Sequence, residues 1–324
     1  MSPIEPTIVV QARVDRALWL WSGVMVERSW GERWLGWTGV DEPETASSKL
    51  RSVRRLVLVT LACEGWFVLG YVPYSSQPAA YGLVACLLLG CAIVGWRDRF
   101  ALPASTLAFV VLLGVVVSVF PHNANHQYLA LLLLILVILA DSRGAEADRN
   151  AVAALQSMRW IAAIGVFWAG AMKLFYGYWL GGEFLAFRVA TDPGFARVLG
   201  FLVPDAELSR LLGLEIHLGA GPFRADAPFL IAISNMTWLL EMMLPLGLLW
   251  SRTRAMSMVA TTLLFVAIQF GAQEVFFGGL MVGLLLLFAR RDRLAGALPW
   301  ITGLYVGWLL RTDILRWIAG GQGG

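Results

Sequence analysis

Long apolar runs separated by short polar connections dominate the chain. Eight runs lie at roughly 56–72, 79–96, 101–120, 127–140, 153–175, 227–250, 255–270 and 275–289, and a ninth lies near 295–310. A helix needs about 20 residues to cross the roughly 30 Å hydrocarbon core of a bilayer. No run sustains the alternation of apolar and polar residues that a membrane β-barrel requires. The pattern predicts an all-α fold: a polytopic helical membrane bundle with about eight or nine transmembrane helices.

The first 48 residues have a different pattern. Five tryptophans lie among charged residues between positions 13 and 37, and indole rings favour the headgroup boundary of a membrane. Residues 1–12 lack the basic and apolar regions of a cleavable signal, and residues 41–48 are polar. We therefore expect an N-terminal interfacial helix and linker over 1–48, followed by a helical membrane domain over 49–324.

The connections between the runs alternate in charge. Arginines occupy the connections near residues 51, 97, 143, 252 and 290, whereas 73–78, 121–126 and 271–274 contain neither lysine nor arginine. By the positive-inside rule, the arginine-rich connections face the cytoplasm. The other connections and the long segment 176–226 then face outward. Within that segment, the apolar spacing over 195–224 fits an amphipathic lid and fits an inert interfacial helix equally well.

Composition supports a membrane location. The chain is 58% hydrophobic and only 15% charged, whereas soluble domains carry about 25% charged residues. This balance excludes a soluble enzyme and a disordered chain. The formal net charge of +3 comes from arginines dispersed along the sequence, with no basic run to follow a nucleic-acid backbone. Arginine also greatly outnumbers lysine, which is typical of GC-rich bacterial genomes, so we expect a bacterial cytoplasmic membrane.

Lys173 stands out because it is one of only two lysines, Lys49 being the other, and lies inside an apolar run. One interpretation is a lysine that extends to the headgroups within an aromatic belt. The other is a desolvated amine, which burial converts into a usable base near neutral pH. Gly170 and Gly177, at helical spacing from Lys173, would let a neighbouring helix or a ligand approach closely.

Other polar residues collect at the same predicted outer level. His126 follows Asn125 where the fourth run begins, and a histidine there is more often a helix-end hydrogen-bonding group than a catalyst. The His122–His126 spacing suits a metal only on a helix, and Pro121 argues against one, so we expect no metal site. Glu64 and Glu241 lie within apolar runs. Each is either functional or a protonated or arginine-paired carboxylate that locks two helices together.

Three short motifs occur in a characteristic order. Asn125-His126-Gln127-Tyr128-Leu129 opens the fourth run, Ala169-Gly170-Ala171-Met172-Lys173-Leu174 ends the fifth, and Tyr178-Trp179-Leu180-Gly181-Gly182 follows. This order resembles the HTTM membrane domain of the vitamin K-dependent γ-carboxylase family. Glu241 in WLLEMMLPL and the Phe276–Gly279 stretch are similar to later helices of that family. The resemblance covers roughly residues 79–290.

The resemblance implies a specific chemistry. The lysine matching Lys173 deprotonates a reduced naphthoquinone, dioxygen adds, and the basic oxygenated quinone removes a proton from a substrate carbon that CO2 then captures. His126 and Asn125 match residues that line that catalytic site. We expect the quinone to lie among the remaining candidates: Tyr128, Gly170, Trp179, Glu241 and Gln269. The implied partners are membrane lipids, the quinone, and a peptide or protein substrate or accessory protein, with neither metal nor nucleic acid.

Two departures from the family keep other functions open. The sequence ends at Gly324 without the large luminal portion of the animal enzymes, and Gln269 stands where the family has an outer-end histidine. Either departure is compatible with a different substrate or with loss of carboxylation. The alternatives are a non-enzymatic quinone- or lipid-binding membrane subunit, including a peptide-maturation partner of a larger complex, and a small-molecule transporter. The transporter is the weakest, because the polar residues gather at one face.

Overall fold

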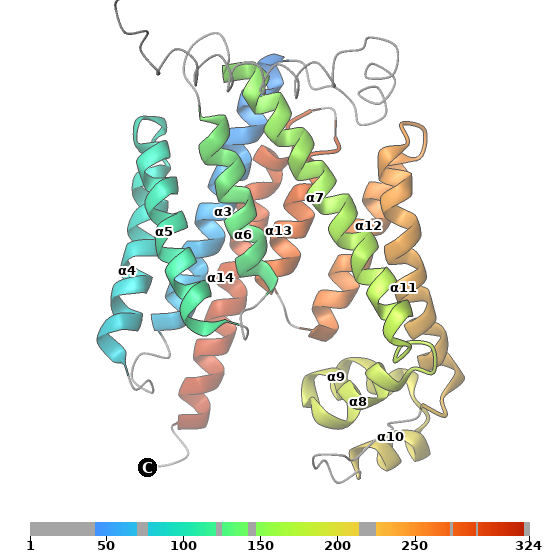
Figure 1. Cartoon of the computed structure of the whole chain (residues 1–324). Coiled ribbons are helices and arrows are strands. Elements are labelled where there is room, and N and C mark those ends of the chain that lie inside the picture. The colour runs from blue at the N-terminus through green and yellow to red at the C-terminus, as the bar shows by residue number, and fades with distance from the viewer. Residues whose placement is uncertain are drawn as a thin grey trace, which may run out of the picture.

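The computed structural model describes residues 43–69, 77–120, 125–141, 147–213, 225–272, 275–289 and 291–320. All regular elements in these ranges are helices, which confirms the all-α class. Figure 1 shows long helices running side by side, with a group of short helices against one end. The interfacial helix predicted over residues 13–37 lies outside the described residues.

The chain alternates between long helices, which run along the bundle, and short helices, which occur in the connections between long ones. The long helices are α3 (Pro43–Leu69), α4 (Pro78–Gly95), α5 (Ala101–Val119), α6 (Asn125–Ala140), α7 (Ala147–Tyr176), α11 (Pro228–Leu249), α12 (Arg254–Ala272), α13 (Val275–Leu286) and α14 (Arg293–Gly320). The short ones are η2 (Asp98–Phe100), α8 (Glu183–Thr191), α9 (Pro193–Leu199), η3 (Gly200–Leu202) and α10 (Asp205–Leu212).

Four helical segments within the described residues are long and apolar enough to cross a membrane. They are Pro78–Gly95, Asp98–Ser118, Ala147–Tyr176 and Pro228–Leu249. Three further apolar helices are shorter: Asn125–Ala140, Arg254–Gln269 and Val275–Leu286. These lengths agree with an integral membrane protein. The count of eight or nine transmembrane helices remains a prediction.

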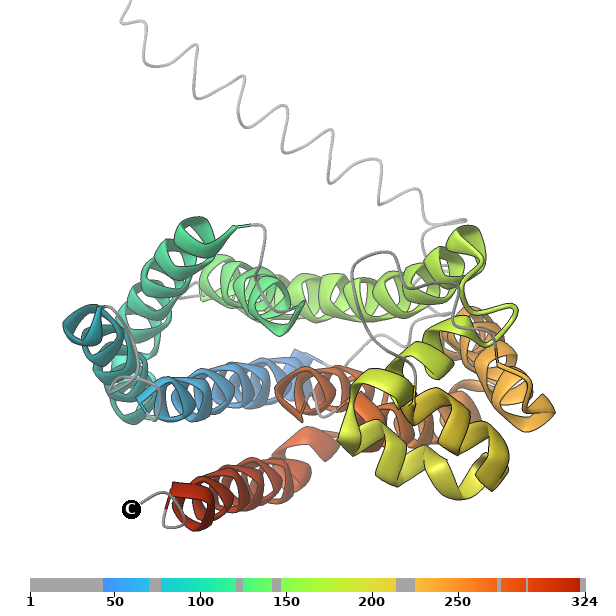
Figure 2. The same cartoon turned by 90° about the horizontal axis from the view of Figure 1, so that it is seen from below.

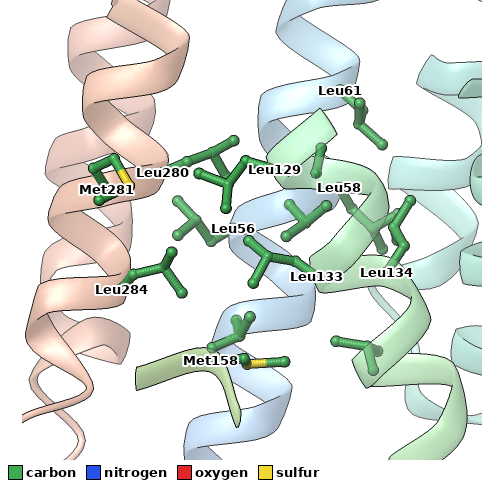
Figure 3. Packing of buried hydrophobic residues seen from close by; sticks show 14 of the residues in the cluster. Leu56, Leu58, Leu61, Leu129, Leu133, Leu134, Met158, Leu280, Met281 and Leu284 are labelled. Carbon is green, nitrogen blue, oxygen red and sulfur yellow. The ribbon is translucent and has the colours of Figure 1, made fainter. Parts of the chain in front are cut away.

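The core lies where α3, α6, α7 and α13 meet (Figure 3). Leu56, Leu133, Met158 and Leu284 are fully buried there. The Leu56 side chain of α3 packs directly on Gly283 of α13, since a Cβ atom added to Gly283 would lie 2.1 Å from Leu56 Cδ2. A small residue at such a contact lets two helices pack without a gap. This central packing fixes the relative positions of the helices that carry the candidate site residues.

The arginine-rich connections gather at one end of the bundle, the upper end in Figure 1, which we call the basic end. The helix ends that flank the short connections without lysine or arginine lie at the opposite end, where α7 ends after Lys173; we call this the Lys173 end. The alternation in charge along the sequence therefore corresponds to two chemically different ends of one bundle.

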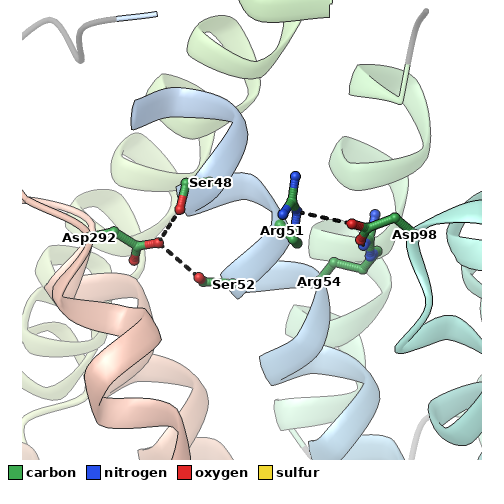
Figure 4. Close-up of polar contacts among 6 residues, drawn as sticks. All are labelled: Ser48, Arg51, Ser52, Arg54, Asp98 and Asp292. Atoms are coloured by element: carbon green, nitrogen blue, oxygen red, sulfur yellow. Dashed lines mark hydrogen bonds and ion pairs between the residues drawn. The ribbon is translucent and has the colours of Figure 1, made fainter. Parts of the chain in front are cut away.

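At the basic end, α3 begins earlier than expected and fastens the connection between α13 and α14. Helix starts at Pro43, within the segment predicted to be a linker, and Ala46 is fully buried. Ser48 and Ser52 each donate a hydrogen bond of 2.9 Å to Asp292 (Figure 4). These contacts explain why a polar segment is helical: its polar groups have tertiary partners.

Two buried cations satisfy carbonyl groups where α13 ends. Lys49 is 1% exposed, and its Nζ donates to the Ala289 carbonyl oxygen at 2.7 Å. Arg159, 3% exposed, donates to the Leu287 carbonyl through Nε at 2.9 Å and through Nη2 at 2.6 Å. The last carbonyls of a helix have no partner within the helix, so donors from other elements stabilise them.

The short helices α8 to α10 form a cover with its own apolar core. Leu185, Val189, Leu211 and Leu230 are buried together in it. Figure 2 shows the cover over part of the Lys173 end, with the ends of α4, α5 and α14 outside it. The amphipathic segment predicted over 195–224 is broken, because Val203 is extended (φ −111°, ψ 131°) before Pro204. Proline disfavours helical backbone in the residue that precedes it.

Candidate functional site

Lys173 and Glu241 form an ion pair between α7 and α11. Lys173 Nζ lies 2.6 Å from Glu241 Oε1 and 2.5 Å from Oε2, so one ammonium position serves both carboxylate oxygens. Glu241 is 3% exposed, whereas a fifth of the Lys173 side chain is accessible. A carboxylate buried in apolar surroundings requires such a partner. The sequence allowed either a functional Glu241 or one that is protonated or paired with an arginine. In the structure the partner of Glu241 is a lysine, the candidate base Lys173.

Gly170 lies against α11 one turn before Lys173. A Cβ atom at Gly170 would lie 2.7 Å from the Trp238 carbonyl oxygen and 2.9 Å from Glu241 Cβ. The absence of a side chain therefore brings the two backbones close enough for Lys173 and Glu241 to meet. Of the two roles open to Gly170, close approach of a neighbouring helix is the one that this geometry supports.

Trp179 completes the surroundings of the lysine. Its ring lies 4.9 Å from Lys173 Nζ, which is a favourable distance for a cation above an aromatic face. Gly177 has φ of +75°, so the chain can turn sharply after α7 and fold Trp179 back toward Lys173. The Trp179 ring stacks on Phe184, and its carbonyl accepts a 2.7 Å hydrogen bond from Ser234 on α11. The structure thus brings together Lys173, Glu241, Gly170 and Trp179.

His126 belongs to a second polar cluster, with Glu64 on α3 and Gln127 on α6. Gln127 Nε2 donates to Glu64 Oε1 at 2.5 Å, and His126 Nε2 lies 3.3 Å from the same oxygen. The His126 contact has the distance of an ion pair but not the geometry of a hydrogen bond. Glu64 Oε2 is buried without a hydrogen-bonding partner among the described residues. This second cluster therefore retains hydrogen-bonding capacity.

Aromatic rings enclose the second cluster on the side of α13 and α14. The Phe276 ring lies 5.6 Å from the His126 ring and 5.3 Å from the Tyr305 ring. Tyr305 is 1% exposed and donates to the Phe276 carbonyl oxygen at 3.3 Å. An apolar enclosure strengthens polar contacts inside it and raises the cost of leaving a polar group without a partner. Glu64 is buried and His126 and Gln127 are part-buried, so the start of α6 carries a largely enclosed polar cluster.

The remaining candidates are more dispersed. Asn125 is exposed at the first residue of α6, and Tyr128 packs at the edge of the main core. Gln269 on α12 packs against Gly278 on α13, and both atoms of its amide are buried without a hydrogen-bonding partner in the part of the chain that the structure describes. His122 lies outside the described residues, as do two further polar residues of the outward-facing segments, His217 and Glu274.

Sequence reasoning missed several functional contacts. Gln127 carried no signal beyond its place in the motif, although it is the donor to Glu64. Within 195–224, where the apolar spacing predicts an amphipathic helix, the charged Glu207 is only 8% exposed and accepts hydrogen bonds from Arg210 and from the Asp226 backbone. The Arg210 guanidinium, followed by that backbone N–H, holds the pKa of Glu207 below its usual value despite burial.

The described residues contain no group of three potential metal-ligating side chains. The polar chemistry at the Lys173 end is therefore that of an amine–carboxylate pair with an indole, and of a carboxylate–imidazole–amide cluster. Comparison with protein-family models, with curated proteins and with solved structures found no match to this chain.

Proposed function

We propose that the chain is an integral-membrane enzyme of the carboxylase-like HTTM type, with Lys173 as its base. The single observation that carries the proposal is the Lys173–Glu241 pair beside Trp179, at the end of the bundle whose short connections, 73–78, 121–126 and 271–274, lack lysine and arginine. The order of the three motifs is a second support. In this proposal the basic end faces the cytoplasm and the Lys173 end faces outward, as the positive-inside rule requires.

The ion pair gives Lys173 a route to the neutral amine. A proton can pass from Nζ to Glu241 along a hydrogen bond of 2.5 to 2.6 Å, which converts two buried charges into a neutral amine and a neutral carboxylic acid. Burial disfavours charged forms, so the neutral pair is accessible in an apolar site. The amine can then accept a proton from a bound molecule, while Glu241 holds the first proton. Glu241 is thus a proton store for the base.

The residues around Lys173 fit a planar, apolar ring that carries hydroxyl groups. The Trp179 face adjoins Nζ, and the exposed rings of Tyr176 and Tyr178, between Lys173 and Trp179 in the sequence, stack on each other. A reduced naphthoquinone, when bound, supplies the acidic hydroxyl and the oxygen chemistry that uses O2 and permits capture of CO2. Lys173 Nζ would hold the hydroxyl proton, and the indole would orient the ring. The unpartnered groups of His126 and Gln269 would bind polar atoms of substrate or quinol.

The test is turnover of reduced naphthoquinone to its epoxide by the detergent-purified protein under oxygen. Wild type should form epoxide, whereas Lys173→Ala and Lys173→Arg should not, because guanidinium does not deprotonate near neutral pH. Glu241→Gln should retain a slow reaction, since it removes the proton store and leaves the amine. Arg252→Gln, an exposed residue at the basic end, serves as the matched control. Equal epoxide formation by wild type and Lys173→Ala would refute the proposal.

A second candidate is a non-enzymatic membrane subunit that binds quinone or lipid. It is favoured by the engagement of both Glu241 oxygens with Lys173 and by the closure of the Gly170 face by α11. Such a pair would fasten α7 to α11 without reacting. Quinone that co-purifies equally with wild type and with Lys173→Arg, without epoxide from either protein, would select this function.

A further inference from the structure

A groove at the basic end combines an apolar floor with arginines that lack acidic partners. The groove measures about 400 Å³ and is lined by Ala92, Ile93, Trp96 and Arg97, at the end of α4. Ile93 is 74% exposed and Trp96 45% exposed, so an apolar strip leads along α4 from Arg97 toward the middle of the bundle. This arrangement lies at the opposite end of the molecule from Lys173 (Figure 1).

The fold concentrates positive charge beside this groove. Five arginines from two separate stretches meet there with one aspartate, Asp98, which leaves a formal surplus of four positive charges; they are Arg51, Arg54, Arg55, Arg97 and Arg99. Asp98 is already engaged, since Arg54 Nη2 lies 2.6 Å and Arg51 Nε 3.5 Å from its carboxylate oxygens (Figure 4). Arginines that the sequence spreads over nearly fifty positions thus form one patch.

Three of these arginines, Arg55, Arg97 and Arg99, have no carboxylate partner among the described residues, and two of the three, Arg55 and Arg97, adjoin the groove. Arg55 lies above the Trp96 ring at 5.0 Å from its centroid, and its Nε is buried without a hydrogen-bonding partner in the described residues. Arg97 lines the groove, is exposed, and has no carboxylate partner in the same described ranges. Guanidinium groups bind phosphate through paired hydrogen bonds, and an indole favours the depth of lipid headgroups.

We propose that this groove binds an anionic phospholipid of the adjoining leaflet, with its phosphate at Arg55 and Arg97 and an acyl chain along Ile93 and Ala92. The apolar strip continuous with the arginines distinguishes a lipid from a free phosphate ion, which would use the charges alone. Basic pockets at helix ends bind anionic headgroups for the same reason. The proposal is independent of any chemistry at Lys173, because the groove and the lysine lie at opposite ends.

The test is native mass spectrometry of the detergent-purified full chain with phosphatidylglycerol or phosphatidylcholine of identical acyl chains. Wild type should bind phosphatidylglycerol about 25-fold more tightly, because two guanidinium groups each contribute about fivefold near a membrane surface. Arg55→Gln and Arg97→Gln should each lose about fivefold, and the double variant should lose the preference. Arg97→Lys should keep most of it, and Arg252→Gln, exposed at the same end, should keep all of it.

Four outcomes would overturn the lipid site. Equal binding of the two lipids would remove the role of charge, and an unchanged double variant would place the lipid elsewhere. Full competition by an equal concentration of inorganic phosphate would assign the arginines to a free anion. A dimer that the double variant abolishes would assign the groove to a second copy of the chain. Unfolding is controlled by requiring each variant to remain monodisperse with the wild-type melting temperature.

Discussion

The cost of breaking the Lys173–Glu241 pair depends on which partner is removed. Lys173→Met leaves a carboxylate that is 3% exposed and loses two charge-assisted hydrogen bonds. Removal of one partner of a buried pair costs about 3–5 kcal/mol, so we expect a loss of about 3 kcal/mol in the free energy of unfolding. Glu241→Gln leaves a lysine whose side chain is one-fifth accessible and can extend to water, so we expect about 1 kcal/mol.

The double variant Lys173→Met, Glu241→Leu tests whether these costs come from the pair. Replacing a buried ion pair by apolar side chains is often close to neutral, so the double variant should be more stable than Lys173→Met alone. The second single variant of the cycle is Glu241→Leu, expected to cost about 1 kcal/mol like Glu241→Gln; with about 3 kcal/mol for Lys173→Met and a nearly neutral double variant, the coupling energy should be about 4 kcal/mol. The assay is equilibrium unfolding in mixed micelles with increasing sodium dodecyl sulfate, followed by tryptophan fluorescence.

A more accessible ion pair in the same molecule provides the control. Arg188, in the last turn of α8, and Asp192, the residue after α8, lie 2.7 Å apart, and about 30% of each side chain is accessible. Arg188→Met should therefore cost at most about 0.5 kcal/mol. The reasoning fails if Lys173→Met and Glu241→Gln have equal, additive costs below about 0.5 kcal/mol, since the pair would then behave like an exposed one.

Three further outcomes follow from single contacts. Gly170→Ala should lower the free energy of unfolding by about 1–3 kcal/mol, because its Cβ would overlap with atoms of α11. Gly165→Ala, with open space around it, should raise the free energy of unfolding by up to about 1 kcal/mol in the same assay. Equal effects of the two substitutions would contradict the close approach of α7 and α11 at Gly170. Arg159→Met should lower the free energy of unfolding by about 2 kcal/mol and make the connection after α13 accessible to protease, because the Leu287 carbonyl loses its hydrogen-bond donor. Unchanged cleavage would show that Arg159 does not hold this connection in place. The folded-state pKa of Glu207 is lowered, so its stabilising contribution is complete above the unfolded value of about 4.5 and is lost as the pH falls through the folded value. Hydrogen exchange in α10 should accelerate across that range in wild type and stay flat in Glu207→Gln; identical profiles would remove Glu207 as the cause.

The sequence determined the helical class and the chemical difference between the two ends. Unbroken apolar runs leave no strand period, and arginine-bearing connections alternate with short arginine-free ones; the helix ends that flank the two kinds of connection lie at opposite ends of the structure. The sequence also placed Lys173 near the end of its helix, because the apolar run that contains Lys173 ends a few residues later. These features depend on local sequence or on the fact that consecutive membrane helices run in opposite directions, so predicting them requires no knowledge of which helices are in contact.

Only the tertiary structure decided the partners of the polar residues. Lys173 and Glu241 are 68 positions apart, and Glu64 and Gln127 are 63 apart, so no local spacing relates them. The five arginines beside the groove look dispersed along the chain and meet only when α3 packs against α4. In a soluble helix the apolar stripe shows which face turns inward. In α6 every face from Leu129 to Ala140 is apolar, because lipid and protein core accept the same side chains, and the sequence therefore does not record which face meets which neighbour.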